Sequence, residues 1–544
     1  MLTRYLLAAE ADKIQDLIFR SSRLREVVGG SQLLTRFCEE VPAALIRHYR
    51  GNFEKDAIIY DGGSFRVLFD QEKTAREFGE HLSEIYRIAT GGSLTVAEPV
   101  AIPEPLDENF TEASEQAEFN LRQAKRKNKG WWAQEHLPYM AICTSCGIGL
   151  AKTLYRDVKN EYLCQSCLHK NAESSQGNLN FLEKFYKIVL EEENMPLDKY
   201  SWPGLTEFNN RSEKDPTEDV ADYDLNRYVA YLVADGNDMG EVFGKCQKRE
   251  TMKKLSKKLD LAICRALAKP TKAIMKNNQL NNRPNFIPVL PLILGGDELF
   301  ALIPAPWALD FAISFCNAYE QEMIKVYKET ELSAHVPKAT ISATVVICKN
   351  KHPYTLAYEV AEATLKKAKQ LYRKIALDRK EYHSIVNFEV VAGGQLTSIP
   401  SNHQFQPTLK PYLVKGNDID GSVLPLQRLI DQRWSLRHIP SKRLHELQSL
   451  YDLAKNNLPS SRQLDQMAPW RKRLDRLLER IDLRSEKQKI AVEKALSELG
   501  GISGWCEVRR PHESIWSGHG FPDLLDAWDF ALSLDKPAHD YEEE

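Results

Sequence analysis

The 544-residue chain is too long for one compact domain, and roughly two to four domains are expected. Its formal net charge of −3 excludes a global basic field, so any RNA or DNA contact requires a local patch or a partner. Acidic residues interrupt positions 1–20 where a signal peptide needs an apolar core, and no apolar run approaches the roughly 20 residues that span a bilayer. We therefore expect a soluble protein of the cytoplasm.

Alternating strand and helix patterns fill the first 130 residues. Apolar runs and helical spacing predict a strand over 2–9, a helix over 31–50, a hairpin over 57–69, a helix over 74–90, a strand over 94–102 and a helix that ends near Lys125. The hairpin turns at a Gly-Gly pair, which suits a tight connection.

The same order of elements returns in the middle of the chain. The predicted elements are a strand over 228–234, a helix over 252–267, a hairpin over 291–303, a helix over 307–329, a strand over 339–348, a helix over 355–373 and a strand over 384–391. A period this long indicates duplicated domains. Aligning Asp61-Gly-Gly with Leu294-Gly-Gly puts Ser64 and Phe65 where the second hairpin has two acids, so chemistry is expected in the second copy.

Between the two copies lie two Cys-x-x-Cys pairs. They are Cys143 with Cys146 and Cys164 with Cys167, separated by 17 residues. This spacing is typical of a tetrahedral structural zinc site without an open position. Two redox pairs are the weaker alternative, because no thioredoxin-like βαβ pattern surrounds them. Residues 171–222 are polar and mixed, which indicates a linker with a helix near 179–193.

Beyond residue 405 the pattern becomes helical. Helices are predicted over 424–434, 441–456 and 469–499. The stretch from Arg471 to Lys494 carries both signs of charge, which is typical of a solvated helix face, with RNA or partner contact as the alternative.

The second hairpin carries the strongest chemical signal. Its tip reads Gly295-Gly296-Asp297-Glu298 between two apolar runs, and two adjacent acids there would repel each other without a cation. The preceding strand ends at Asp235, so three carboxylates would meet if the two segments pair in one sheet. Such a cluster binds divalent ions that clamp triphosphate oxygens. The alternative is a turn with two solvated acids.

Two further residues are candidates for this site. Lys369, on the helix after the third strand, would neutralise a triphosphate, although an exposed helix lysine is equally compatible with the sequence. Asp238 lies three residues after Asp235 and either joins the site or caps the following helix.

These motifs together resemble a known family. Asp235-Gly-Asn-Asp-Met-Gly240, the hairpin tip and the Ala-Thr-Leu-Lys-Lys-Ala-Lys369 helix are similar to a polymerase/cyclase palm domain, and GGDEF diguanylate cyclases share the hairpin. Two palms around a four-cysteine knuckle, with a helical region after them, resemble the large subunit of type III CRISPR effector complexes. The stretches Lys13–Ile18, Leu24–Leu34 and Tyr354–Glu362 also resemble that family.

The resemblance implies an α+β fold with four parts. They are a first, degenerate ferredoxin-like palm (1–132), a zinc-knuckle domain and linker (133–222), a second palm with the GGDE hairpin (223–403) and a C-terminal helical domain (404–544).

The resemblance also implies an activity. It is the synthesis of cyclic oligoadenylates from ATP with Mg²⁺ or Mn²⁺, in antiviral defence, when the guide RNA of the complex pairs with a target RNA. Partner subunits are implied, with guide and target RNA bound mainly through them. Carried over by position, Asp235, Asp297 and Glu298 would be catalytic and bind magnesium, while Gly236, Asp238, Gly295, Gly296 and Lys369 would bind nucleotide.

Three departures from the family pattern keep alternatives open. Glu298 stands where the family usually has Asp, and Asn237 stands where the strand end usually has a second Asp. These two departures sustain a degenerate scaffold subunit as the alternative, beside a standalone cyclic-nucleotide synthase. The third departure is a missing His-Asp nuclease, since the only such pair is His539-Asp540 near the end, and we expect no DNase activity.

Overall fold

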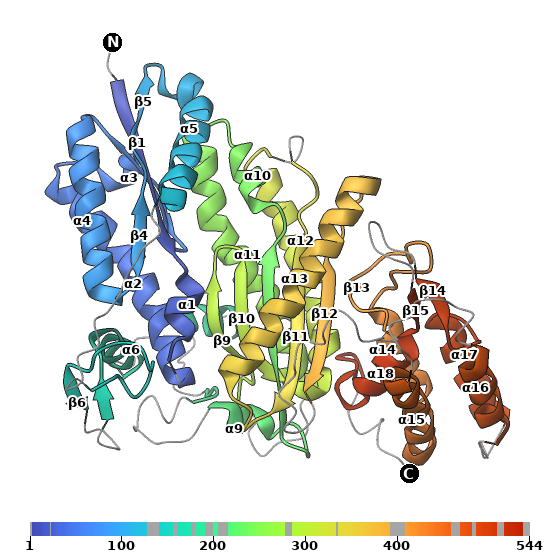
Figure 1. Cartoon of the computed structure of the whole chain (residues 1–544). Coiled ribbons are helices and arrows are strands. Elements are labelled where there is room, and N and C mark those ends of the chain that lie inside the picture. The colour runs from blue at the N-terminus through green and yellow to red at the C-terminus, as the bar shows by residue number, and fades with distance from the viewer. Residues whose placement is uncertain are drawn as a thin grey trace.

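The computed structural model describes most of the chain. The described residues are 3–21, 23–127, 141–155, 161–175, 180–190, 200–204, 216–277, 285–332, 336–391, 408–457, 468–480, 486–508 and 516–536. Two sheet domains with helices packed on them lie side by side, and the C-terminal helices follow beyond the second sheet (Figure 1). The His539-Asp540 pair lies outside the described residues.

The first palm has the predicted order of elements. They are β1 (Thr3–Asp12), α1 (Ile14–Phe19), α2 (Leu24–His48), α3 (Phe53–Asp56), β2 (Ala57–Asp61), β3 (Ser64–Phe69), α4 (Glu72–Thr90), β4 (Ser93–Val96), β5 (Val100–Pro103) and α5 (Leu106–Lys127). The sheet order is β2-β3-β1-β4, with β5 also paired to β1. The central first strand, flanked by the hairpin on one side, is the ferredoxin-like arrangement.

The second palm repeats this topology. Its elements are β8 (Tyr228–Gly236), α10 (Met239–Gly244), α11 (Arg249–Asn277), β9 (Leu290–Gly295), β10 (Glu298–Pro304), α12 (Ala308–Glu329), β11 (Ile341–Lys349), α13 (Tyr354–Arg379) and β12 (Ile385–Val391). The sheet runs β13-β12-β11-β8-β10-β9, where β13 is Tyr412–Leu413. The five residues from Val229 to Val233 on the central strand are buried, which explains its uninterrupted apolar sequence.

Helices α2 and α11 extend furthest beyond their predicted bounds. Helix α2 begins at Leu24 and runs through Gly29-Gly30, two residues that weaken an isolated helix. A Cβ on Gly29 would lie 2.0 Å from the carbonyl oxygen of Lys170, so this glycine permits close packing against a helix of the cysteine module. Helix α11 continues to Asn277 past Pro270 because it packs against α12 along its length.

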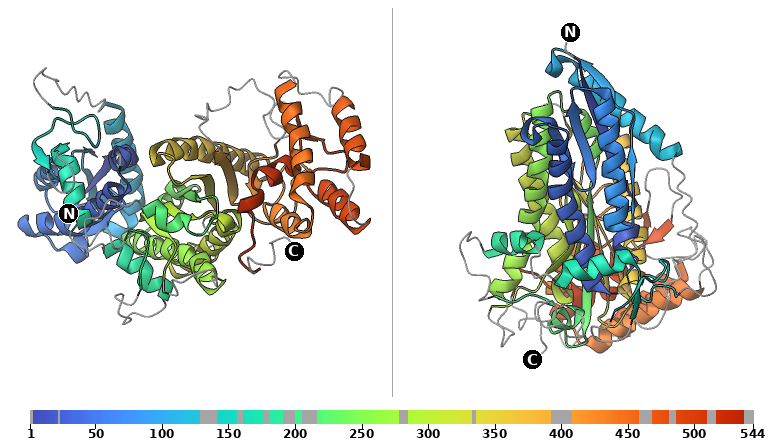
Figure 2. Two further views of the ribbon diagram at one scale, coloured as in Figure 1. Left: turned by 90° about the horizontal axis from the view of Figure 1, so that it is seen from below. Right: turned by 90° about the vertical axis from the view of Figure 1, so that its left-hand side faces the viewer.

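The cysteine module and the linker follow the first palm. They contain β6 (Thr153–Tyr155), β7 (Glu161–Leu163), α6 (Gln165–Ser175), α7 (Asn180–Leu190) and α9 (Pro216–Ala221). Helix α6 packs on α2, and Arg36 pairs with Glu173 at 2.5 Å. The views from below and from the side place the module against the first palm (Figure 2).

The C-terminal region is more mixed than predicted. It contains α14 (Gln427–Ser435), α15 (Ser441–Asn457), α16 (Ala468–Arg480), α17 (Glu486–Glu498), β14 (Cys506–Val508), β15 (Trp516–Gly518) and α18 (Gly520–Asp526). The predicted helix over 469–499 corresponds to α16 and α17, and residues 481–485 between them are outside the described part. Across the described ranges, none of the helices combines the length and the apolar character that a membrane crossing requires.

Candidate active site

The GGDE hairpin pairs with the central strand of the second palm. Glu298, the first residue of β10, lies opposite Asp235 of β8, and the backbone N–H of Gly236 donates to the Asp297 carbonyl at 3.1 Å. Directly opposed residues of antiparallel strands project to the same face of a sheet. The structure therefore places Asp235 and Glu298 on one face, with Asp297 beside them in the turn.

The Asp297 side chain at the hairpin tip packs directly against Gly236, the glycine that ends β8. A Cβ on Gly236 would lie 2.9 Å from the Asp297 Cβ, so only glycine leaves room for that side chain. Burial and the neighbouring charge of Asp235 raise the pKa of Asp297 to about 7. The same two causes raise the pKa of Glu298 to about 7. Such shifts are common where carboxylates are kept together for function.

Lys369 lies in the same site and contacts a carboxylate directly. Its Nζ is 2.5 Å from Asp235 Oδ2, and both side chains are about one-quarter exposed. Within the described ranges, the four cysteines alone form a group of three or more metal-binding side chains with all donor atoms within 4.8 Å. The carboxylates of Asp235, Asp297 and Glu298 do not form such a group, and Lys369 supplies the positive charge beside Asp235.

Asn237 and Asp238 have contacts away from these carboxylates. Asn237 is buried, donates to Thr340 Oγ1 at 3.0 Å and accepts from the Ser342 hydroxyl at 2.8 Å. Asn237 therefore belongs to the packing between β8 and β11. Asp238 occupies the position before α10 but makes no capping hydrogen bond with its side chain, because the Tyr372 hydroxyl donates to it at 2.5 Å. The alternative of a capping role for Asp238 is wrong.

Asp260 of α11 is a site residue that the sequence did not reveal. Its Oδ1 accepts the backbone N–H of Gly296 at 2.7 Å, and its Oδ2 lies 3.5 Å from Lys184 Nζ. Gly296 has φ of 59°, in the left-handed region that favours glycine. Asp260 thus holds the turn from which Asp297 projects. In the sequence, Asp260 is one acid beside the apolar Leu259 in a lysine-rich helix, and this pattern does not distinguish a site residue from a surface acid.

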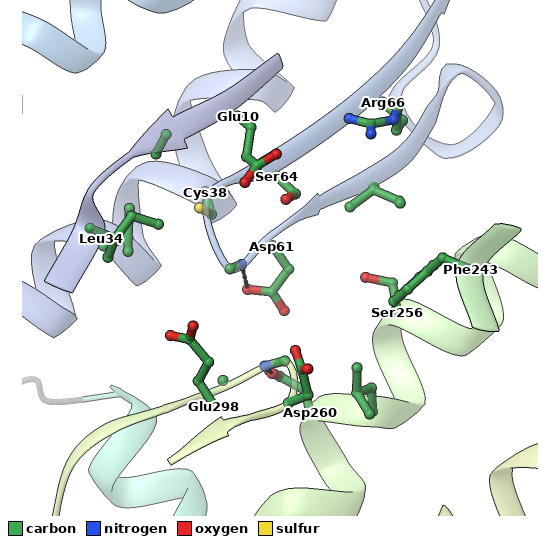
Figure 3. A pocket seen from close by; sticks show the side chains of 18 of the residues that line it. Glu10, Leu34, Cys38, Asp61, Ser64, Arg66, Phe243, Ser256, Asp260 and Glu298 are labelled. Carbon is green, nitrogen blue, oxygen red and sulfur yellow. Dashed lines mark hydrogen bonds between the residues drawn. The ribbon is translucent and has the colours of Figure 1, made fainter. Parts of the chain in front are cut away.

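A cavity of about 920 Å³ lies between the two palms. The two hairpins face each other across it, with Asp61 of the first palm directed toward Asp260 and Glu298 (Figure 3). Gln15 of α1 reaches the same space and its Nε2 lies 3.5 Å from Glu298 Oε1. Burial and the charge of Asp260 raise the pKa of Asp61 to about 7.

The strand register corrects the predicted alignment of the two hairpins. Ser64 is the first residue of β3 and lies opposite Glu10, as Glu298 lies opposite Asp235. The Ala11 N–H donates to the Gly63 carbonyl at 2.8 Å, just as that of Gly236 donates to Asp297. The counterparts of Asp297 and Glu298 are therefore Gly63 and Ser64. The alignment with Ser64 and Phe65 was displaced by one residue because the Gly-Gly pairs occupy different positions in the two turns.

The four predicted zinc ligands come together in the cysteine module. The sulfur atoms of Cys143, Cys146, Cys164 and Cys167 all lie within 4.8 Å of one another, and three of the four residues are buried. The Gly149 N–H donates to Cys146 Sγ at 3.4 Å, and a Cβ on this glycine would lie 2.9 Å from Cys164 Sγ. Hydrogen bonds from Cys164 and Cys167 lower the pKa of the Cys146 thiol. Four converging sulfur donors fit a tetrahedral structural zinc ion.

The comparisons with known proteins agree with this geometry. A family model described as Cas10/Cmr2, second palm domain, matches residues 228–377. A comparison with curated proteins finds no significant match.

Solved structures match over nearly the whole chain. The crystal structure of a Csm1-Csm4 cassette in complex with cA4 is similar with 14% identity and a TM-score of 0.54, covering 97% of this chain and 69% of that one. The cassette in complex with cA3 is similar with 14% identity and a TM-score of 0.52, covering 97% and 70%. For the cassette in complex with pppApA, with 15% identity and a TM-score of 0.43, the match covers 68% of this chain and only 53% of that one.

The family match falls on the domain that carries the acidic hairpin, and the fold match extends to the sister domain and the C-terminal region. Residues 228–377 match the second palm domain of Cas10/Cmr2, and the fold of nearly the whole chain is similar to that of the Csm1-Csm4 cassette structures.

Proposed function

We propose that this protein is a metal-dependent nucleotidyltransferase that joins ATP into cyclic oligoadenylates in a type III CRISPR complex. The observation that carries the proposal is the strand register that sets Glu298 opposite Asp235, which pairs with Lys369, while Asp297 and Glu298 line the inter-palm cavity. The Cas10/Cmr2 palm match and the fold shared with Csm1-Csm4 cassettes in complex with cA4 and cA3 support it.

The site residues divide into two roles. Asp235, Asp297 and Glu298 offer the oxygen donors that magnesium prefers, and a bound divalent ion would polarise the triphosphate and activate a ribose hydroxyl. Lys369 would exchange its contact with Asp235 for a phosphate, since a lysine ammonium is a compact charge on a flexible stem. Asp260 keeps the turn in place through the Gly296 N–H.

The first palm contributes the facing wall of the cavity. Joining two nucleotides requires that both be held at once, and the cavity lies between both hairpins. Glu10 and Lys125 of the first palm line it and lie 2.6 Å apart, in the arrangement of Asp235 and Lys369. We infer that the first palm holds the second nucleotide.

Partners follow from the same comparison. The matched fold belongs to cassettes of Csm1 with Csm4, and we infer that this chain assembles with a comparable subunit and with guide RNA. Target RNA would then switch on synthesis.

Incubation with ATP and Mg²⁺ tests the proposal. The chain is assayed alone, with its partner subunits and guide RNA, and with target RNA added, and products are separated by chromatography. Cyclic oligoadenylate that forms only with target RNA supports the proposal, and product from the chain alone would support a standalone synthase. Absence of product in every arm, with the Asp297→Ala/Glu298→Ala variant identical to the parent, would overturn both.

A scaffold role is the second candidate. Two observations favour it. Lys369 already forms an ion pair with Asp235, and the carboxylate oxygens of Asp235, Asp297 and Glu298 do not all lie within 4.8 Å of one another. Calorimetric titration with Mn²⁺ separates the two candidates, because a scaffold has no need of an ion at Asp297. Saturable binding that is lost in Asp297→Ala/Glu298→Ala favours the enzyme.

A further inference from the structure

A second groove lies on the other side of α11 from the hairpin. Its volume is about 1230 Å³, and α7, α11 and α12 form its walls with the C-terminal residues Leu534 and Asp535. Six cationic side chains line it, namely Lys184, Lys187, Arg265, Lys269, Lys272 and Lys276. Three carboxylates, of Glu183, Glu322 and Asp535, oppose them. The groove is a local basic surface on a chain whose net charge is −3.

The cations are arranged in a line along α11. Arg265, Lys269, Lys272 and Lys276 follow each other at steps of four, three and four residues, which places them on one face of the helix. At 1.5 Å per residue this row is about 16 Å long. Lys184 and Lys187 stand on the opposite wall, on α7. An extended anion fits this arrangement better than a compact one.

Three of these cations make only long contacts within the chain. Lys187 lies 3.7 Å from Glu183, Arg265 lies 3.6 Å from Glu322, and Lys269 donates to Gln321 at 3.4 Å. Ion pairs of this kind at an exposed surface contribute little to stability. The side chains of Lys187, Arg265 and Lys269 can therefore turn to a ligand at little cost.

The lining also indicates which part of a ligand is bound. Of the described residues that line the groove, none is aromatic, so no ring is available for stacking a base. Lysines and an arginine bind phosphate oxygens without regard to sequence. Lys184 lines both this groove and the inter-palm cavity, so the two spaces adjoin.

We propose that this groove binds the phosphodiester backbone of a single-stranded oligonucleotide. The strand lies along α11 with its phosphates on the row from Arg265 to Lys276 and on the α7 lysines. Two sources supply such a backbone: a longer RNA strand, or a short oligonucleotide that leaves the adjoining cavity. Binding needs neither ATP nor a metal ion, so the proposal stands apart from the nucleotidyltransferase reaction.

Fluorescence anisotropy with the full chain tests the proposal. The probes are a fluorescein-labelled 20-nucleotide RNA of mixed sequence and a labelled linear triadenylate, each titrated between 50 and 200 mM salt without ATP or metal. The variant Lys269→Gln/Lys276→Gln removes two charges from the row. The control Lys254→Gln/Lys257→Gln removes two exposed charges from the same helix outside the groove.

We expect the groove variant to bind the probe about tenfold more weakly and the control to bind like the parent. The slope of log K against log salt should fall by about 1.4, or about 0.7 for each phosphate that the variant no longer neutralises. Weaker binding of the 20-nucleotide probe assigns the groove to RNA, and weaker binding of triadenylate alone assigns it to the short oligonucleotide. Equal binding by both variants and the parent, or equally weakened binding in both variants with unchanged thermal unfolding, would overturn the proposal.

Discussion

The two palms share a scaffold and differ at the tip of one hairpin. Each places a lysine of the last palm helix against a carboxylate of the central strand, Lys125 with Glu10 at 2.6 Å and Lys369 with Asp235 at 2.5 Å. This pair is therefore a property of the duplicated fold. Asp297 and Glu298, by contrast, have no acidic counterpart in the first palm, where Gly63 and Ser64 take their places, so they require an explanation of their own.

Turn chemistry accounts for how the tips diverged. In the first palm both central residues, Gly62 and Gly63, have positive φ, as a type I′ turn requires. In the second palm only Gly296 has positive φ and Asp297 does not, which is the pattern of a type II′ turn. The second central position of that turn accepts a residue with a side chain. The change of turn type thus admits an acid at the place where the first palm needs glycine.

Removing the two acids of the second palm's hairpin tip should have the largest effect on activity, and the matched change in the first palm should have almost none. We expect Asp297→Ala/Glu298→Ala to lower nucleotidyl transfer about 10³-fold or more, because these are the metal ligands that we propose and such ligands contribute several kcal/mol to the transition state. The measurement is the initial rate of product formation from ATP and Mg²⁺ in the assembled complex. The matched change in the first palm, Ser64→Ala, should leave the rate within about threefold, and an equal loss there would contradict the division of roles between the palms.

Loss of a cysteine from the zinc knuckle should destabilise the first palm and leave the second palm unchanged. Helix α6 of the module packs on α2, and Lys170 donates to the Leu17 carbonyl of α1 at 2.5 Å. We expect Cys167→Ser to lower the free energy of unfolding by about 3 kcal/mol or more, because structural zinc contributes directly to folding. Hydrogen exchange should quicken in α2 and stay unchanged in β8.

Cys506→Ser, which lies outside the module, provides the control for this effect. Metal analysis should return about one zinc per parent chain and none for Cys167→Ser. A folded parent without metal would show that the four cysteines serve another purpose.

The fold was largely predictable because its signals are local. Apolar runs and helical spacing predict both copies of the palm, and the Cys-x-x-Cys spacing predicts the cluster of four cysteines. Helix ends were less predictable, as at Gly29, where contact with Lys170 outweighs weak helix propensity.

Only the site residues that belong to a recognisable strand or hairpin were predictable from the sequence. Asp235, Asp297 and Glu298 sit at strand ends and turns, and their pairing follows from the sheet. Asp260 and Gln15 reach the site from other elements, and tertiary packing alone brings them there. The register of the sister hairpins was also misread by one residue, because a Gly-Gly pair does not reveal which glycine has positive φ.

The two lysines should separate the roles of the palms. We expect Lys369→Ala to lower kcat about 10- to 100-fold, because it removes the charge that we propose neutralises a phosphate at the reacting end. Lys125→Ala should instead raise KM for ATP severalfold with kcat almost unchanged, since we propose that the first palm only holds a nucleotide. The measurement is a set of rate curves over ATP concentration. Identical losses of kcat in both variants would place chemistry in both palms.

The smallest expected effect concerns the carboxyl pair between the palms. The pKa of Asp61 is raised to about 7 in the folded protein by burial and by Asp260, whereas an unfolded aspartate titrates near 3.9. The folded state therefore retains a proton that the unfolded state has lost, and this contribution to stability is complete below about pH 4 and is lost as the pH rises through 7.

Asp61→Asn keeps a neutral donor beside Asp260 at every pH, so it should raise the free energy of unfolding by about 1 kcal/mol at pH 8 and leave it unchanged at pH 4. Thermal unfolding of the metal-free protein at the two pH values measures the difference, with Asp452→Asn on the exposed face of α15 as the control. A shift of equal size at both pH values would mean that the amide acts through packing and that no proton is shared between the palms.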